Sequence, residues 1–299
     1  MKILVTGSTG LVGSALVSEL RTDGDEVLRL VRSQPQAADE VLWNPEKGIE
    51  EIERTEGLDA VVHLAGENIA AGRWSEERKR RIRDSRVQGT RVLSEALASL
   101  ASPPKALASA SAIGYYGDRG DEILTELSAP GEGFLPDVCR QWEAATEMAE
   151  RTGIRVVHLR FGVILSEAGG ALQKMLTPFK LGVGGKVGSG QQYMSWIALA
   201  DVIGIIKQAI KDESLSGPVN VVAPNPVTNL EFTKTLGRVL SRPTVFPVPA
   251  FALRLAFGEM ADAALLASER VEPERLKEAG YIFEYPELEG ALQHILKKS

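Results

Sequence analysis

Residues 1–13 read MKILVTGSTGLVG, a short apolar strand that runs directly into glycines and then into a helix. Gly7 allows a tight turn, Gly10 lets a pyrophosphate approach the backbone, and Gly13 lets the helix pack close to the strand. The N–H groups and the positive dipole end of that helix would face the anion. A second strand over 26–31 completes a βαβ unit. The stretch therefore predicts a dinucleotide site at Gly7, Thr9, Gly10, Leu11, Val12 and Gly13. The alternative is a purely structural turn; a Walker loop is excluded, because no Gly-Lys-Ser/Thr follows.

Apolar strand-like runs alternate with helical patterns along the first half of the chain. The expected strands are 3–5, 27–31, 60–64, 106–109 and 156–160, and the expected helices are 10–21, 76–100 and 137–151. This alternation predicts an α/β fold, a Rossmann-type doubly wound parallel sheet over residues 1–165. Glycine-rich and then proline-rich segments predict a smaller, lid-like C-terminal substrate domain over 166–194 and 223–299. The apolar helical segment 197–210 indicates that 195–222 returns to the first domain, with substrate between the two.

Composition limits the classes of partner. The 299 residues carry a formal charge of −6, which disfavours a nucleic-acid-binding surface. The basic run RKRRIR at 78–83 is interpreted as a solvated helix face, with contact to an anionic ligand as the alternative. The chain has a single cysteine, Cys139, and no signal segment, and no apolar run approaches the roughly 18 residues that span a bilayer. We therefore expect a cytoplasmic monomer or homodimer with no membrane partner.

The residue after the second strand indicates which dinucleotide is bound. An NAD enzyme usually places an acidic residue there, to hold the ribose hydroxyls. This chain has Arg32-Ser33, with no acidic residue before Asp39. A guanidinium pairs well with a 2′-phosphate, so the sequence predicts NADP(H), with a solvated loop arginine as the alternative.

The stretch HLAGEN, residues 63–68, follows the third expected strand. We expect Leu64, Ala65 and Gly66 to run beside the cofactor, and His63 to be a packed, hydrogen-bonded residue rather than an acid or base. None of the three histidines has partners at metal-ligand spacing, so the sequence predicts no metal site.

Several further motifs carry a family resemblance. They are TGSTGLVG, VVHLAGENIA, RWSEERKRRIRDSR, GYYGD, LGVGGKVGSGQQYMSWI and the tail from Gly217. The chain resembles the extended short-chain dehydrogenase/reductase superfamily, and within it the epimerase-like subgroup with a distinctive C-terminal domain (family 39U-like). The resemblance implies an NAD(P) cofactor and places Arg86 near it; the alternative for Arg86 is a charge on the helix surface.

The resemblance also implies a set of catalytic residues, which the chain matches only in part. The superfamily uses a Ser together with a Tyr and a Lys four residues apart on a helix. Ser111, in SASAIGYYGD, matches the serine, but Leu135 and Cys139 occupy the other two positions. Tyr115 and Tyr116 are the available substitutes as proton donors, with aromatic packing as the alternative. We interpret Cys139 as a small buried residue rather than a reactive thiol.

Two functions follow from these observations. The first is an NADP(H)-dependent oxidoreductase or epimerase that acts on a sugar-nucleotide-like or other small hydroxyl or carbonyl substrate. Lys186, Gln191, Gln192 and Tyr193 are its candidate substrate contacts, and Trp196 is expected to be structural. The second is an NADP(H)-binding sensor or scaffold without hydride chemistry, which the missing Tyr/Lys pair favours. The expected cleft and lid favour the enzyme.

Overall fold

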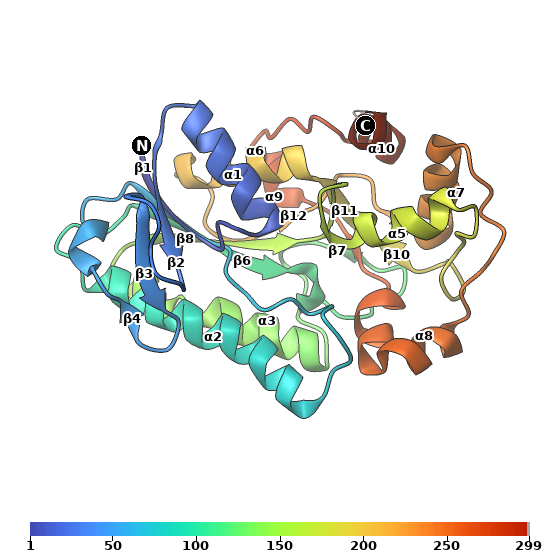
Figure 1. Cartoon of the computed structure of the whole chain (residues 1–299), viewed down its shortest axis with the longest axis horizontal. Helices are drawn as coiled ribbons and strands as arrows, with labels where there is room; N and C mark the ends of the chain where they lie inside the picture. Colours follow the sequence, from blue (N-terminus) through green and yellow to red (C-terminus); the bar gives the residue numbers. More distant parts are fainter. Residues whose placement is uncertain (298–299) are drawn as a thin grey trace.

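An eight-stranded sheet forms the centre of the molecule in the computed structural model, which describes residues 1–297 (Figure 1). The strand order is β12-β8-β6-β5-β1-β2-β3-β4, and every neighbouring pair is parallel except β3 and β4. The bounds are β1 Lys2–Thr6, β2 Glu26–Val31, β3 Glu40–Asn44, β4 Gly48–Ile49, β5 Ala60–His63, β6 Ala106–Ala112, β8 Arg155–Phe161 and β12 Gly217–Val221. The expected doubly wound Rossmann-type sheet is confirmed.

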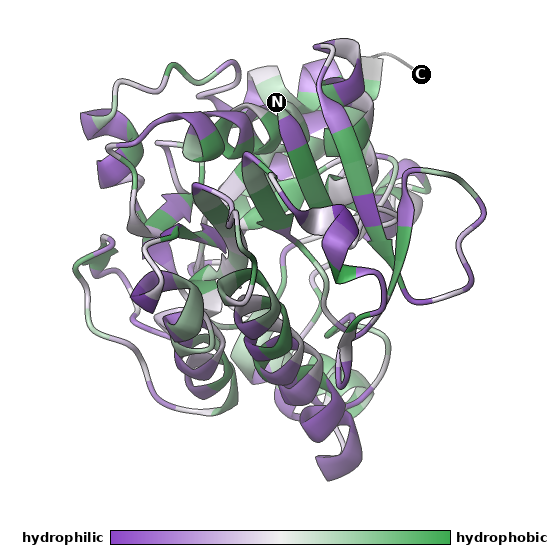
Figure 2. Ribbon diagram, turned by 90° about the vertical axis from the view of Figure 1, so that its left-hand side faces the viewer, coloured by the Kyte–Doolittle hydropathy of each residue, from purple (hydrophilic) through white to green (hydrophobic). Residues whose placement is uncertain are grey.

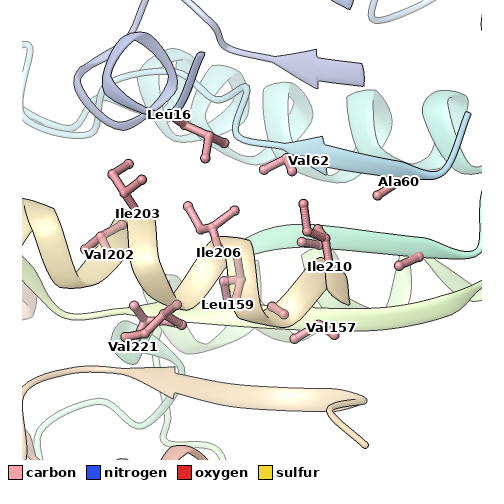
Figure 3. Packing of buried hydrophobic residues seen from close by; sticks show 14 of the residues in the cluster. Leu16, Ala60, Val62, Val157, Leu159, Val202, Ile203, Ile206, Ile210 and Val221 are labelled. Carbon is pink, nitrogen blue, oxygen red and sulfur yellow. The ribbon is translucent and has the colours of Figure 1, made fainter. Parts of the chain in front are cut away.

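Helices cover both faces of this sheet (Figure 1). One face carries α1 (Leu11–Thr22) and α6 (Leu199–Lys211), with α9 (Glu274–Glu278) beside β12. The other carries α2 (Glu76–Ala98), α3 (Phe134–Ala144) and α4 (Glu147–Arg151). Between α1, α6 and the sheet, Leu16, Ile203 and Ile206 pack against strand residues such as Val62 (Figure 3). Each such buried aliphatic side chain stabilises the fold by roughly 1.5–3 kcal/mol.

A second hydrophobic cluster lies beside the sheet and is built mostly from the C-terminal half. It contains α5 (Gly170–Lys180), α7 (Asn229–Leu240), α10 (Leu288–Lys297) and the strand pair β9 (Val163–Leu165) with β11 (Trp196–Ala198). Trp196 is fully buried there, and its Nε1 donates to the carbonyl of Asn225 at 3.1 Å, so its role is structural as expected. The remaining helices are α8 (Ala250–Phe257) and the π-helical turn η3 (Ala261–Leu265).

Two short ladders hold this C-terminal region together, and the second joins it to the first half of the chain. The antiparallel pair is β10 (Tyr193–Met194) with β13 (Val227–Thr228), and the parallel pair is β7 (Ile123–Leu124) with β14 (Arg270–Val271). Two 3₁₀ turns, η1 (Ile52–Thr55) and η2 (Ile113–Tyr115), complete the structure. No helix within residues 1–297 is both long enough and apolar enough to span a bilayer.

One expected helix and three strands of the main sheet differ from the sequence-based expectation. The single helix expected over 137–151 is two helices, because Thr146 at the junction hydrogen-bonds through Oγ1 to the Glu143 carbonyl at 2.8 Å and to the His158 ring at 2.9 Å. Strands β3, β4 and β12 of the main sheet were not expected. Figure 2 shows why the main strands were easier to recognise, since they are largely hydrophobic while the flanking helices carry hydrophilic stretches.

Candidate functional site

A pocket of about 520 Å³ opens at the carboxyl ends of the central strands, within the range typical of ligand sites. It follows the chain from the glycine turn after β1, past the ends of β5 and β6, to α3 and the start of β9. The predicted residues that line it are Gly7, Gly10, Leu11, Val12, Gly13, Leu64, Arg86 and Ser111. The predicted residues outside its lining are Thr9, Arg32, Ala65, Gly66, Tyr115 and Tyr116.

The glycine turn has the geometry of a phosphate cradle. Gly7 adopts φ +66°, and a Cβ there would lie 2.8 Å from the backbone of Leu64. A Cβ at Gly13 would lie 2.2 Å from the Gly7 carbonyl oxygen, so helix α1 could not pack this close to the turn. At Gly10 the nearest such atom is 3.3 Å away, which leaves space for a ligand.

The start of α1 is free to bind an anion. Gly10 is its N-cap residue, no side chain caps it, and its first turn contains no acidic residue. Helices α2 and α7 are capped, by Ser75 and by a capping box of Thr228 and Glu231, whereas α3, α5 and α6 share the lack of a side-chain cap with α1. The first N–H groups of α1 therefore keep their hydrogen-bonding capacity and face the pocket.

The segment after β5 is fixed by a buried hydrogen-bonded chain. Thr6 Oγ1 accepts from the N–H groups of Leu64 and Ala65, each at 3.1 Å, and contacts His63 Nδ1 at 2.7 Å. The other ring nitrogen of His63 contacts Thr90 Oγ1 at 3.0 Å. Burial lowers the pKa of His63 to about 4, so the ring is neutral. His63 is thus the packed, hydrogen-bonded residue that the sequence favoured, and it holds the strand end in place.

Arg86 reaches the pocket from α2. Its guanidinium lies 5.0 Å from the Trp142 ring centroid and donates to the Ile82 carbonyl at 3.1 Å. Burial lowers the pKa of this guanidinium, and among residues 1–297 no carboxylate forms an ion pair with it. An anionic ligand beside this buried cation would stabilise its charged form, and the cation would in turn favour binding of the anion. Gly66 lies against it, since a Cβ there would be 3.5 Å from Arg86 Cζ.

Arg32 lies at the end of β2 with an exposed side chain. Within the described part of the chain it forms no ion pair. The next acidic residue after it, Asp39, is held by Arg29, whose Nε lies 2.7 Å from Asp39 Oδ2, and by Arg21. This carboxylate is therefore occupied, and Arg32 is the side chain that remains available at the strand end.

Ser111 belongs to a buried polar network rather than to a free catalytic pair. Its hydroxyl donates to Glu143 Oε1 at 2.7 Å, and Glu143 receives two 2.8 Å hydrogen bonds from Arg160. Arg160 also donates to the Tyr116 hydroxyl at 2.9 Å, and Tyr116 donates to Asn220 Oδ1 at 2.7 Å. The Ser111 proton therefore points at Glu143 and away from the pocket.

The structure does not bring the two tyrosines to the pocket. Tyr116 is fully buried, and burial raises the pKa of its hydroxyl to about 12. The Tyr115 ring stacks on Arg160, with the guanidinium carbon 3.6 Å from the ring centroid. Arg160 therefore contacts both side chains, by a hydrogen bond to Tyr116 and by stacking on Tyr115. We therefore assign proton transfer to neither residue.

Other residues complete the wall of the pocket opposite the glycine turn. Leu135 and Cys139 do line it, and burial raises the pKa of the Cys139 thiol to about 12, which makes the thiol unreactive. Glu269 also lines it, and the sequence analysis did not identify this residue. Its only local signal is a carboxylate between Ser268 and Arg270, which does not distinguish it from an ordinary surface residue.

The glycine-rich loop does not supply pocket residues. Lys186 Nζ donates to the Ser189 carbonyl at 3.0 Å, and Gln192 Nε2 donates to the Val187 carbonyl at 3.0 Å. Gln191 and Tyr193 are likewise outside the pocket lining. These four residues stabilise their own loop and its neighbours. Residues 1–297 contain no cluster of three metal-ligating side chains.

The strand order, the uncapped helix at a glycine turn and the pocket at the carboxyl ends of the strands define a dinucleotide-binding Rossmann protein. Comparison with known families agrees. Residues 3–222 match the NAD dependent epimerase/dehydratase family, and residues 248–295 match a domain of unknown function, DUF1731.

The chain belongs to the NAD-dependent epimerase/dehydratase family, among the epimerase family proteins similar to SDR39U1. It is 46% identical over 290 residues to an epimerase family protein of Mycobacterium bovis, covering 97% of this chain and 96% of that protein. It is 39% identical over 305 residues to the chloroplastic SDR39U1 homologue of Arabidopsis thaliana, covering 99% and 87%. The crystal structure of human SDR39U1 isoform 2 with NADPH is similar over 100% of both chains, with a TM-score of 0.92 and 34% identity.

Proposed function

We propose that this protein binds NADP(H) and uses it to reduce, or reversibly oxidise, a small substrate with a carbonyl or hydroxyl group. The observation that carries the proposal is the continuity of the pocket, which runs from the uncapped start of α1 to Ser111 at the end of β6. A dinucleotide laid along such a sheet has its pyrophosphate at the glycine turn and its reacting end beyond the next strands. The human relative solved with NADPH supports the same cofactor.

The residues present fit such a cofactor. The Gly10–Gly13 backbone would hold the pyrophosphate, Arg32 the 2′-phosphate and Leu64–Gly66 the connecting sugar, with Arg86 as a further cation. Bound NADPH supplies a hydride donor. Ser111 Oγ, whose proton is held by Glu143, would accept a hydrogen bond from a substrate hydroxyl, and the mainly apolar wall of Leu135, Val138 and Phe161 would exclude water from it.

A sensor without hydride chemistry is the second candidate. The specific observation in its favour is that Leu135 and Cys139 line the pocket where the superfamily pattern places Tyr and Lys. The sensor would bind NADPH but oxidise none of it. An enzyme would oxidise NADPH, and the absorbance of NADPH would decrease.

The two candidates are separated by one experiment. NADPH affinity is measured by fluorescence titration, and turnover is then measured with a panel of carbonyl metabolites, with Gly10→Val as the control unable to hold cofactor. Carbonyl-dependent NADPH oxidation above the control supports the enzyme. Tight NADPH binding with no turnover across the panel supports the sensor, and the absence of NADPH binding overturns both.

A further inference from the structure

Glu269 is held against the pocket by contacts from three separate segments. Its N–H donates to the Tyr193 carbonyl at 3.2 Å, and its carbonyl accepts from Ser195 Oγ at 2.7 Å. The N–H of Ser268 donates to Asp118 Oδ1 at 3.1 Å, and Arg270 begins the ladder between β14 and β7. The backbone on both sides of Glu269 is therefore fixed, and its side chain lines the pocket.

The Glu269 carboxyl faces the end of the pocket where α3 lies. Its charge acts on the Cys139 thiol, where it adds to burial and to Glu143 in raising the pKa of that thiol. Cys139 and Leu135 form the α3 side of the pocket, next to Gly114 and Ser111. The carboxyl thus belongs to the same pocket as the residues that surround the expected reacting end of the cofactor, and it is close enough to Cys139 to act on its thiol.

The Glu269 side chain is half-buried and, unlike Glu143 and Glu126, its carboxyl has no partner within residues 1–297. Glu143 is paired with Arg160, and Glu126 Oε1 accepts the N–H of Asn220 at 3.0 Å. Within residues 1–297 no donor reaches the Glu269 carboxyl oxygens. Burial, with a contribution from Asp118, raises the pKa of Glu269 to about 8. Near neutral pH this group is therefore mainly a carboxylic acid that still has its proton to donate.

We propose that Glu269 is the proton donor and acceptor at the reacting end of this pocket, supplied by the C-terminal region in place of the absent Tyr/Lys pair. This inference rests on the proposed function. In the reduction, the carbonyl carbon gains a hydride from NADPH while its oxygen takes the Glu269 proton. The products are an alcohol, NADP⁺ and a Glu269 carboxylate, which solvent then reprotonates. Ser111 cannot supply this proton without giving up its bond to Glu143.

The test uses the cofactor alone, because the oxidised nicotinamide carries a positive charge that the reduced ring lacks. Such a charge within about 4–6 Å lowers a carboxyl pKa by about one unit or more. Affinity for NADP⁺ relative to NADPH should therefore increase about tenfold between pH 6.5 and 9.5. Titration of the 2′-phosphate is common to both cofactors and cancels in this ratio.

The other ionisable groups around Glu269 must be considered in the same experiment. They are Asp118 from the loop after η2, Cys139 from α3, Arg86 from α2, and the adjacent Arg270 and Tyr193. Asp118→Asn removes the neighbouring charge and should move the midpoint of the pH dependence to lower pH without abolishing it. Glu278→Gln, at an exposed glutamate of α9, is the matched control and should leave the pH dependence unchanged.

Glu269→Gln keeps the shape of the side chain and should make the NADP⁺/NADPH affinity ratio independent of pH. The ¹³C chemical shift of the Glu269 carboxyl in the unmodified protein gives an independent reading, expected to titrate near pH 8. An unchanged pH dependence in Glu269→Gln, or a carboxyl that titrates near its ordinary pKa, overturns the assignment while the proposed function stands. Failure of the unmodified protein to bind either cofactor would overturn the proposed function itself. With a substrate in hand, Glu269→Gln should lower kcat by about 10²–10⁴-fold, and Glu269→Asp should restore part of it.

Discussion

Replacing Gly10 with valine should abolish cofactor binding and leave the fold intact. The backbone at Gly10 has φ −77° and ψ 173°, which a β-branched residue adopts readily. A Cβ there meets only the Gly7 carbonyl oxygen, at 3.3 Å, so the rest of the side chain extends into the pocket. Because valine is a poorer N-cap residue than glycine, we expect the free energy of unfolding to fall by about 1 kcal/mol, too little to unfold the protein.

The loss of affinity should be much larger. A pyrophosphate pushed away from the start of α1 loses at least two hydrogen bonds to charged oxygens, each contributing about 1.5–3 kcal/mol. The NADPH dissociation constant should then increase by about 10²–10⁴-fold. Fluorescence titration measures the affinity, and urea unfolding followed by circular dichroism measures the stability.

Two further glycines serve as controls for this experiment. A Cβ at Gly13 would meet backbone at 2.2 Å, so Gly13→Ala should destabilise the fold by about 1–3 kcal/mol. A Cβ at Gly290 meets nothing within 4 Å, so Gly290→Ala in α10 should stabilise slightly and leave NADPH affinity unchanged. If Gly10→Val binds NADPH within about threefold of the unmodified protein, the phosphate cradle lies elsewhere.

Three other predictions concern specificity and stability. NADPH should bind at least about tenfold more tightly than NADH, and Arg32→Asp should remove or invert this preference; equal affinities of the unmodified protein would refute the role of Arg32. Glu143→Gln leaves the buried Arg160 charge unpaired and should destabilise the fold by about 3–5 kcal/mol in urea unfolding, whereas Glu147→Gln at an exposed pair should cost less than about 1 kcal/mol. Burial lowers the pKa of His63 from 6.5 in the unfolded chain to about 4 in the folded protein. The neutral ring therefore contributes about 3 kcal/mol to the free energy of unfolding above pH 6.5, and this contribution is lost as the pH falls towards 4. His63→Asn should flatten that part of the stability profile, and an identical profile in the variant would contradict the assignment.

The sequence predicts the fold and part of the pocket lining because local patterns determine both. The glycine turn, the apolar strands and Leu64 all lie where their spacing indicates. Strand β3 was missed because its sequence, with Leu42 between the buried Val41 and Trp43, shows three consecutive apolar residues and no polar/apolar alternation, although its burial does alternate. The break at Thr146 involves a hydrogen bond to His158, which belongs to strand β8. Helical periodicity along the sequence gives no information about such a contact with a distant strand.

The reacting end of the site could not be predicted in the same way. Tyr116 follows β6 as expected, yet its direction is decided by Arg160 and Asn220, which come from two other strands. Glu269 is held at the pocket by the pairing of β14 with β7 and by backbone contacts with Tyr193 and Ser195, and no local pattern indicates these contacts. Where distant segments determine the position of a side chain, that position is known only from the three-dimensional structure.

The ladder between β7 and β14 also has a consequence for the order of events during biosynthesis. The residues that we assign to the cofactor are all made before Ala112, whereas the pocket wall that carries Glu269 emerges from the ribosome after Ser268. A nascent chain therefore acquires its cofactor-holding residues long before its proposed proton donor. A chain interrupted between these two points would contain every residue that we assign to the cofactor but lack the group that completes the chemistry.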